Sequence, residues 1–415
     1  MAITINDTPI GGTTFTPAFN PVEYCVSSTN TAQTNFKYIA DLYYAGATSP
    51  IRYVQGADPN NGYCRFDFSS VLKSFALNSA PTTSGSTFQH ASNSYNNFTV
   101  KFGEQYGASS AIVNYVDLAT ASNTVWNASL EQNEYWGTTN PTTQYLLAVG
   151  STSKFLTSIP RDTSLKIGTA EMHYLYFLQS ASTAYNCVIK TFDSTGSLIQ
   201  SVIFGTTFNS TQKMQYVGVG THNFANLTGA ELRFSASVGL PVISAATTYY
   251  TAQIFNSGSQ AISEAMTFYL DSSECAWETP YRLCWLNKQG GYDFFTFYWN
   301  SKKQTTYVKS DMMRKSWEWS GTSAVYNSYQ RGKIQNNTIA TDKITINSGW
   351  ITEEQSTWLE QLVASPDVFL VDNTNNLTAI VVKTPSYDFK TLEMDTLFNL
   401  SIEVELSYNR YRQQA

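Results

Sequence analysis

The C-terminal part of the chain constrains the fold most, because it sets one helix pattern among strand patterns. Residues 352–364 carry apolar side chains at helical spacing, and Thr352 with Gln355 makes a capping-box pattern at the start of the segment. Pro366 disfavours helix in the residue before it, so the helix is expected to end by Ser365. The sequence therefore predicts a helix over 352–364. Its expected buried face consists of Trp358, Leu359, Leu362 and Val363.

Three strand patterns follow the predicted helix. Residues 368–371 and 380–383 are short and mostly apolar, and residues 400–408 alternate apolar and polar side chains, which is the period of a half-buried strand. Packing Trp358 of the helix against the apolar face of the last strand would contribute roughly 1.5–3 kcal/mol. The pattern predicts a mainly β domain with one short flanking helix. The apolar positions of the last strand are Ile402, Val404, Leu406 and Tyr408.

The length and composition favour several β domains. The 415 residues exceed one ordinary hydrophobic core. Charged residues make up 13% of the chain, about half of the usual share, while aromatic residues make up 14%. Such a chain suits β structure with much surface intended for partners. The formal net charge of −6 argues against broad nucleic-acid binding, and the basic pairs at 302–303 and 314–315 are interpreted as solvated loop charges.

The strand and turn patterns divide the chain into three predicted blocks. Residues 1–100 form an N-terminal β domain, and residues 101–272 form a β-sandwich insertion of jelly-roll type. Residues 273–415 form a C-terminal β domain that contains the helix at 352–364. The first and third blocks share paired aromatic strands followed by a short helix, so they are expected to pack together. The stretch 78–97 is rich in Ser, Thr and Asn and is predicted to be a loop.

The chain shows no recognisable catalytic motif. It has no Gly-x-Ser-x-Gly elbow, no phosphate loop and no His-Glu-x-x-His pattern, and its three histidines lie far apart. Glu403 and Glu405 project from one face of a predicted strand, about 7 Å apart, and are interpreted as an acidic row rather than as a glycosidase pair. The sequence therefore predicts no catalytic, metal-binding or cofactor-binding residues, and a protein that is not an enzyme.

The cysteines and the N-terminus favour folding in a bacterial cytoplasm. The five cysteines lie at long spacings without a Cys-x-x-Cys pair, so they are expected to be free thiols. The first residues lack the basic and apolar regions of a signal peptide, and no apolar run approaches the roughly 20 residues of a membrane span. We therefore expect a soluble chain with no export by the general route and no membrane insertion.

Aromatic side chains mark two candidate contact surfaces. The run at 292–299 is aromatic on both faces, so it is either central in a domain or buried against another chain. Trp126 and Trp136 are able to stack on sugar rings, which makes them candidate glycan-binding residues. The candidate interface residues of the aromatic run are Tyr292, Phe294, Phe295, Phe297 and Trp299.

Three strings carry a family resemblance: YRLCWLNKQGGYDFFTF at 281–297, WITEEQSTWL at 350–359 and SPDVFL at 365–370. They resemble virion proteins of tailed bacteriophages that infect Bacteroidetes, including crAss-like phages. The likeness covers the third block best and the start of the first block more loosely, whereas the middle block resembles no known family. The layout of one helix within a sheet is also similar to the tail-tube, distal-tail and hub fold.

The resemblance implies an oligomeric ring in the tail, hub, collar or baseplate region of a virion. Its partners would be copies of itself and other virion proteins, with transient contact to passing phage DNA. Glu403 and Glu405 would then face the channel and repel that DNA. The length of the chain and its middle insertion depart from simple tube proteins, which favours a hub, collar or baseplate position over a plain tube.

Two other functions compete with a structural role. The first is a receptor-binding or glycan-binding adhesin of the virion, which requires Trp126 or Trp136 to be exposed. The second is a polysaccharide hydrolase, for which the sequence supplies no convincing pair of carboxylates. The structural role is the leading hypothesis.

Overall fold

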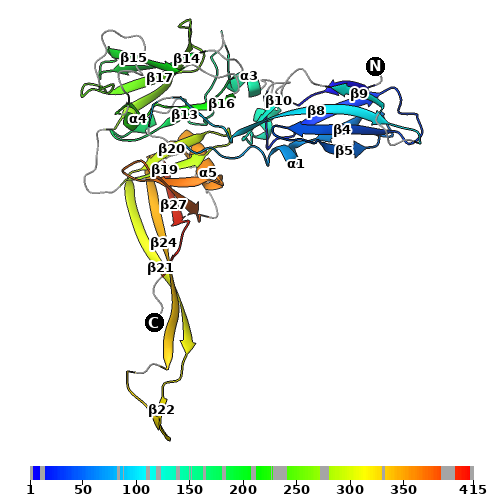
Figure 1. Ribbon diagram of the computed structural model, residues 1–415. Coiled ribbons are helices and arrows are strands. Elements are labelled where there is room, and N and C mark those ends of the chain that lie inside the picture. The colour runs from blue at the N-terminus through cyan, green and yellow to red at the C-terminus, as the bar shows by residue number, and fades with distance from the viewer. Residues whose placement is uncertain are drawn as a thin grey trace. The chain divides into compact units, whose positions relative to one another are not determined.

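Strands dominate the computed structural model of the chain (Figure 1), which confirms the mainly β prediction. Backbone contacts divide the chain into two units. Unit 1 comprises Met1–Ser273 and the segment Leu286–Asp293, and unit 2 comprises Glu274–Trp285 and Phe294–Ala415. Residues 1–100 therefore share a unit with the middle block. The structure describes residues 3–9, 15–81, 85–86, 88–108, 113–117, 123–136, 141–148, 150, 152–161, 165–179, 184–206, 212–225, 227, 241–271, 280–329, 332–384 and 398–411.

Unit 1 begins with a sandwich of two sheets. Its strands are β1 (Ile3–Asp7), β2 (Phe15–Pro17), β3 (Glu23–Ser28), β4 (Lys37–Tyr44), β5 (Ile51–Gln55), β6 (Cys64–Asp67), β8 (Tyr95–Gln105), β9 (Val113–Asp117) and β10 (Asn123–Trp126). One sheet has the order β1-β3-β6, and the other has the order β2-β10-β8-β4-β5 with β9 beside β8. Aromatic rings fill the space between the sheets, since the Phe102 centroid lies 5.5 Å from Tyr24 and 5.9 Å from Phe66. Helix α1 (Ser69–Leu72) buries Leu72 in the same core.

A second pair of sheets follows in unit 1. Its strands are β7 (Phe88–His90), β11 (Leu146–Leu147), β12 (Leu165–Ile167), β13 (Tyr174–Gln179), β14 (Tyr185–Phe192), β15 (Leu198–Thr206), β16 (Met214–Gly218), β17 (Tyr249–Asn256) and β18 (Met266–Leu270). The sheets have the orders β11-β13-β16-β7 and β12-β18-β17-β14-β15. Phe177 of β13 meets Tyr185 of β14 edge to face at 6.5 Å, so the two sheets share a core. This arrangement is consistent with the predicted β-sandwich.

Strands β7 and β8 contradict the loop prediction for residues 88–90 and 95–97, whereas the other described residues of the stretch 78–97 lie outside strands and helices. Phe88 lies 6.0 Å from Phe177 and 6.3 Å from Phe204 between ring centroids, and β7 pairs with β16. One half-buried aromatic residue therefore packs a polar segment against sheets that are distant in the sequence. The other short helices of unit 1 are α2 (Gln132–Tyr135), α3 (Pro141–Tyr145) and α4 (Thr221–Ala225).

Unit 2 is built on one sheet of order β20-β19-β25-β26-β27-β24-β21. Its elements are β19 (Tyr281–Leu286), β20 (Tyr292–Phe297), β21 (Trp299–Met313), β22 (Glu318–Ser320), β23 (Ser323–Val325), β24 (Lys333–Ile351), α5 (Glu353–Ala364), β25 (Val368–Val371), β26 (Leu377–Val382), β27 (Phe398–Leu406) and β28 (Arg410–Tyr411). Strands β21 and β24 are much the longest, and β28 pairs with β24. Figure 1 shows these two strands running on beyond the rest of their sheet.

Helix α5 confirms the helix prediction at its first turn and on its buried face. The Thr352 hydroxyl accepts a hydrogen bond from the Gln355 amide at 3.3 Å, and the Gln355 side chain accepts one from the Thr352 amide at 3.1 Å. The Trp358 ring packs 5.2 Å from Trp285 and 5.8 Å from Phe295, and α5 also contacts β27. The predicted buried residues Trp358, Leu359 and Leu362 are buried, whereas Val363 is half-buried.

The last strand ends earlier than its pattern predicts. Ile402 and Val404 are buried, as expected, but β27 ends at Leu406 and Tyr408 is exposed. After Leu406 the pairing is interrupted, and β28 then continues along the same strand, β24, in the same direction with the register shifted by two residues.

We expect Trp358→Ala to lower the free energy of local unfolding of α5 and β25 by about 3–5 kcal/mol, because it removes a large side chain from a closed core. Native-state hydrogen exchange of the amides in these two elements measures this. The matched control is Trp319→Ala, which removes a 65% exposed ring and should change the same free energy by less than about 0.5 kcal/mol. Equal effects of the two substitutions would contradict the assigned core.

Candidate functional site

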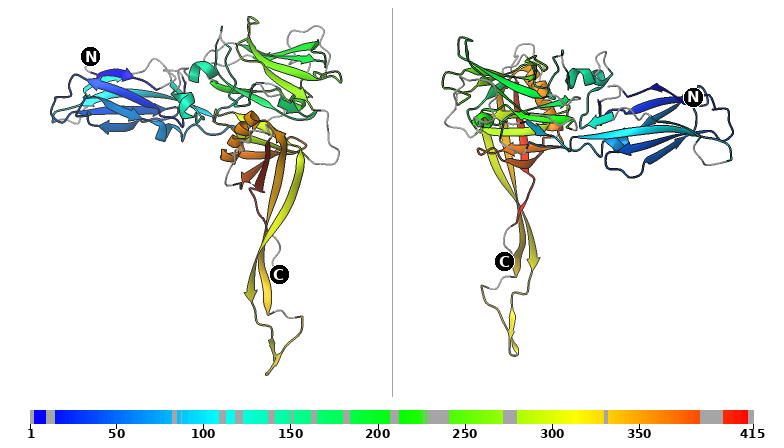
Figure 2. Two further views of the ribbon diagram at one scale, coloured as in Figure 1. Left: turned by 180° about the vertical axis from the view of Figure 1, so that it is seen from behind. Right: turned by 45° about the horizontal axis from the view of Figure 1, so that its top comes forward.

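The most distinctive surface of the described chain is a long β-hairpin, residues 299–343, which we call the arm. Strand β21 pairs antiparallel with β24 from Trp299 opposite Asn347 to Met313 opposite Lys333, and the small hairpin β22–β23 forms the tip. At about 3.3 Å per residue, the 15 residues of β21 extend roughly 50 Å. Both views of Figure 2 show the arm as a ribbon that leaves the sheet of unit 2.

The arm exposes an unusual number of large apolar side chains. Every residue of β21 is exposed except Thr305, which is half-buried. Met313 is 79% exposed and Trp319 is 65% exposed. The exposed large apolar residues of the arm are Trp299, Tyr307, Val308, Met312, Met313, Trp317, Trp319, Val325, Tyr326 and Tyr329. A concentration of apolar side chains on one exposed element is typical of a surface that another molecule covers.

The arm is also basic, in a chain that is acidic as a whole. Residues 299–343 contain eight Lys and Arg and three Asp and Glu, which gives +5. Because the whole chain carries −6, the remaining residues carry −11. Lys333 of the arm is paired with Asp311 at 2.8 Å, and Lys315 lies over the Trp317 ring at 5.3 Å. The arm therefore combines exposed apolar area with a positive potential.

Strand β21 forms one end of the sheet order of unit 2. Its outer edge has no strand partner among the residues that the structure describes. A free edge of this length presents a row of backbone N–H and C=O groups to which an added strand can bind.

The root of the arm is fixed by a buried carboxylate. Asp342 of β24 accepts hydrogen bonds at 2.7 Å from Thr305 of β21 and at 2.7 Å from Arg410 of β28. The hydrogen bond from Thr305, and after it the Arg410 guanidinium, lowers the pKa of Asp342 below its ordinary value. This one side chain therefore ties three strands together where the arm leaves the sheet.

The two predicted channel-facing carboxylates lie on β27 beside lysines. Glu403 is paired with Lys343 at 2.7 Å, and Glu405 approaches Lys383 at 3.6 Å. The hydrogen bond to Glu403 raises the pKa of Lys343. Each of the two carboxylates is thus paired with a lysine, and their orientation toward a channel stays a prediction.

The predicted aromatic interface is mostly part of the core. Tyr292, Phe294 and Phe297 are buried, and Phe295 is half-buried against Trp358. Of the candidate interface residues, Trp299 is the one that is exposed, and its ring lies 6.0 Å from Trp350. The double-sided aromatic pattern therefore reflects a strand covered within its own chain, and the interface expectation is wrong for the three buried residues.

The two candidate glycan-binding tryptophans have opposite environments. Trp126 is 0% exposed, and its indole N–H donates to the Gln289 carbonyl at 3.0 Å. No face of this ring is available for a sugar, so the expectation for Trp126 is wrong. Trp136 is 56% exposed and follows α2 directly.

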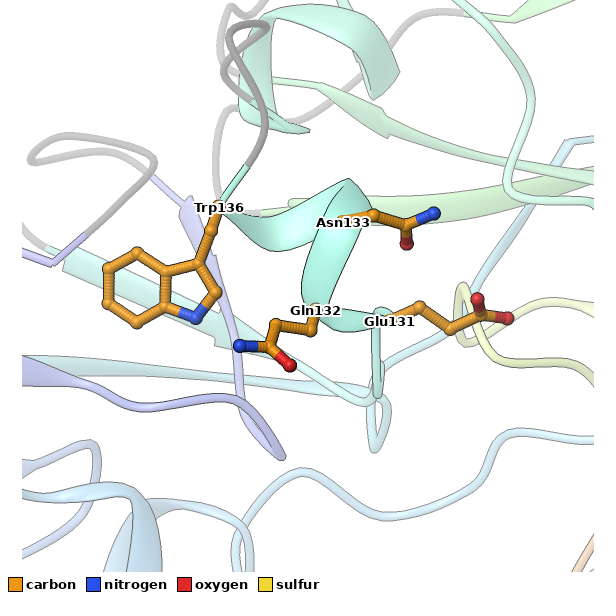
Figure 3. Close-up of a pocket in the computed structure, with 4 residues that line it drawn as sticks. All are labelled: Glu131, Gln132, Asn133 and Trp136. Atoms are coloured by element: carbon orange, nitrogen blue, oxygen red, sulfur yellow. The ribbon is translucent and has the colours of Figure 1, made fainter.

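Trp136 borders a pocket that is also lined by Glu131, Gln132 and Asn133 (Figure 3). The side chains of Trp136 and Gln132 point to one side of α2, whereas those of Asn133 and Glu131 point to the other. Glu131 is engaged by Lys288 at 2.7 Å. An indole face beside an amide is a surface on which a sugar ring can stack and hydrogen-bond.

The remaining candidate features are metal-binding groups, membrane-spanning helices and the cysteines. Within the described residues, no group of three or more His, Cys, Asp or Glu is placed to hold a metal ion, and no helix is long and apolar enough to cross a membrane. Four of the cysteines are free and buried, and Cys275 lies outside the described residues.

No protein-family model matches the chain, and no curated protein matches it.

Sequence reasoning missed the arm, although two signals were present. The basic pair at 302–303 was assigned to a loop but lies in β21, whereas the pair at 314–315 lies in the connection after β21, as predicted. The segment 333–351 is rich in β-branched Ile and Thr, contains no proline and is long enough for a single extended strand. A strand pattern of that length next to a basic aromatic segment is the signal that points to a projecting hairpin.

We expect Asp342→Asn to speed amide exchange in β28 and at the root of β21, because the variant lacks the charge that holds Arg410. Since the pKa of Asp342 is lowered, its contribution is present above the ordinary carboxyl value of 3.8 and is lost as the pH falls through the lower folded-state value. The difference from wild type, measured by hydrogen exchange, should therefore shrink at acidic pH. Asp311→Asn, at an exposed pair far along the arm, is the control and should leave the root unchanged.

Proposed function

We propose that the chain is a non-enzymatic structural subunit that assembles with copies of itself through the arm, forming an oligomeric ring in a tailed-phage virion. The observation that carries this proposal is the arm, which is long, basic, apolar and anchored at its root. A two-stranded ribbon without a covering face is marginally stable in water, so such an element gains most when a partner covers it. Assembly is the function that such an element serves.

The chemistry of the arm suits a protein partner. Its tip carries tryptophan and tyrosine side chains, which are the residue types that dominate binding energy at protein interfaces. The lysines and arginines add steering toward a negatively charged surface.

The virion setting rests on the resemblance of residues 281–297, 350–359 and 365–370 to tailed-phage virion proteins. A sheet with α5 packed against it supports a domain of tail-tube type for unit 2. The additional β domains of unit 1 favour a hub, collar or baseplate position, with other virion proteins as neighbours and passing DNA as a transient contact. Assembly would take place in the cytoplasm of the bacterial host.

We expect Trp317→Ser combined with Trp319→Ser to convert the assembled protein to monomer, because each central tryptophan of an interface contributes about 2 kcal/mol or more. Light scattering of the purified protein, with negative-stain images of the same sample, measures this. Trp136→Ser removes an exposed tryptophan elsewhere and should leave the oligomer intact. A wild-type protein that stays monomeric at all concentrations would contradict the proposal.

A second candidate function is glycan binding at Trp136, which the exposed indole face beside Gln132 favours. In this hypothesis the chain is an adhesin of the virion, and unit 1 contacts the host surface.

For the adhesin hypothesis we expect Trp136→Ala to weaken binding of a glycan-array hit at least tenfold, which corresponds to about 1.4 kcal/mol. Trp319→Ala, which removes a 65% exposed tryptophan on the arm, is the matched control and should bind normally. An array without any hit, or equal loss in both variants, counts against this function.

A further inference from the structure

The outer face of α5 is acidic. Glu353, Glu354 and Glu360 are exposed, and the helix contains no lysine or arginine. None of the three makes an ion pair within the described part of the chain, whereas the opposite face of the helix is buried on Trp358 and Leu362. The helix thus presents an unpaired negative surface on a rigid, well-packed element.

The arm provides the complementary surface in the same unit. The distal residues Lys309, Arg314 and Lys315 are exposed, and none of them forms an ion pair among the residues that the structure describes. Met312 and Met313 lie between them and are exposed as well. Adaptable methionine side chains flanked by cations suit a helix surface that carries carboxylates with aliphatic stems.

The arm tip and α5 of one chain cannot meet. Helix α5 begins two residues after β24 ends, and β24 runs for 19 residues from the tip to that point. Lys309 is opposite Thr338, so at about 3.3 Å per residue β24 separates it from the start of the helix by roughly 40 Å, and Arg314 and Lys315 lie farther along the arm. Because β24 is a continuous strand anchored at Asp342, the arm does not fold back on its own helix. The complementary surfaces therefore belong to different copies.

We propose that the distal arm of one copy docks on the acidic outer face of α5 of a neighbouring copy. The inference rests on the proposed function and names the partner surface of the arm. The contact joins two different patches, so it is heterologous, and repetition of a heterologous contact closes a ring when its rotation permits. The exposed Met312 and Met313 beside these cations favour a protein surface over nucleic acid, because a row of phosphates offers them no apolar contact.

A charge-swap experiment tests the contact. The arm variant combines Lys309→Glu, Arg314→Glu and Lys315→Glu, and the helix variant combines Glu353→Lys, Glu354→Lys and Glu360→Lys. Each alone should weaken self-association on the order of 100-fold, because like charges then face each other. The chain carrying all six changes should recover most of the lost affinity. The control combines Lys73→Glu, Lys166→Glu and Lys190→Glu, three exposed lysines of unit 1, and should assemble like wild type.

Analytical ultracentrifugation over a range of concentrations provides the readout. Since lysines at the start of α5 oppose the helix dipole, the milder variant Glu354→Gln with Glu360→Gln is measured as well and should give a smaller loss in the same direction. The helix variants are compared with wild type by near-ultraviolet circular dichroism of the buried Trp358 environment.

The outcomes separate the inference from the proposed function. A wild type that assembles and an arm variant that assembles equally well would overturn the docking inference and leave the structural role standing. Loss in both single variants without recovery in the combined one would also overturn it. A monomeric wild type that binds a short double-stranded DNA through the arm lysines would overturn both the inference and the proposed function. Recovery in the six-change chain supports the contact.

Discussion

Unit 2 depends on one strand, β24, whose two halves lie in different environments. Its C-terminal half is flanked by β21 and β27 and lies in the sheet that α5 helps to cover, whereas its N-terminal half is paired with β21 and, over two residues, with β28. An isolated two-stranded ribbon is marginal in water. The arm is ordered because the same hydrogen-bonded ladder continues into a packed core, where burial supplies the stability that the ribbon lacks.

The packing at the base of that strand explains why the arm has a defined direction. Trp358 closes the core over Trp285 and Phe295, and Asp342 joins β21, β24 and β28 at the edge of the sheet. The lowered pKa of Asp342 means that this junction is charged at any pH near neutrality. A ribbon with a fixed direction and little flexibility loses less conformational entropy on binding a partner than a flexible ribbon does.

The sequence predicted those elements whose signals lie within the element itself. The capping box at Thr352 and the apolar face around Trp358 specify α5 without reference to the rest of the chain. Burial could not be predicted in the same way. Trp126 and Phe88 are placed by sheets that are distant in the sequence, and the aromatic run at Tyr292 has the same pattern whether another chain or its own chain covers it. The arm was missed because basic and aromatic residues in sequence do not reveal that a strand continues beyond its core.

The segregation of charge along the chain bears on the risk of aggregation at the arm. A long free edge flanked by exposed apolar side chains is a template for uncontrolled strand pairing between chains. Two such edges can pair only if two arms of +5 approach within a few ångströms, and at moderate ionic strength their repulsion opposes this. The lysines of the arm thus act as gatekeepers against aggregation, and this protection weakens as salt concentration rises.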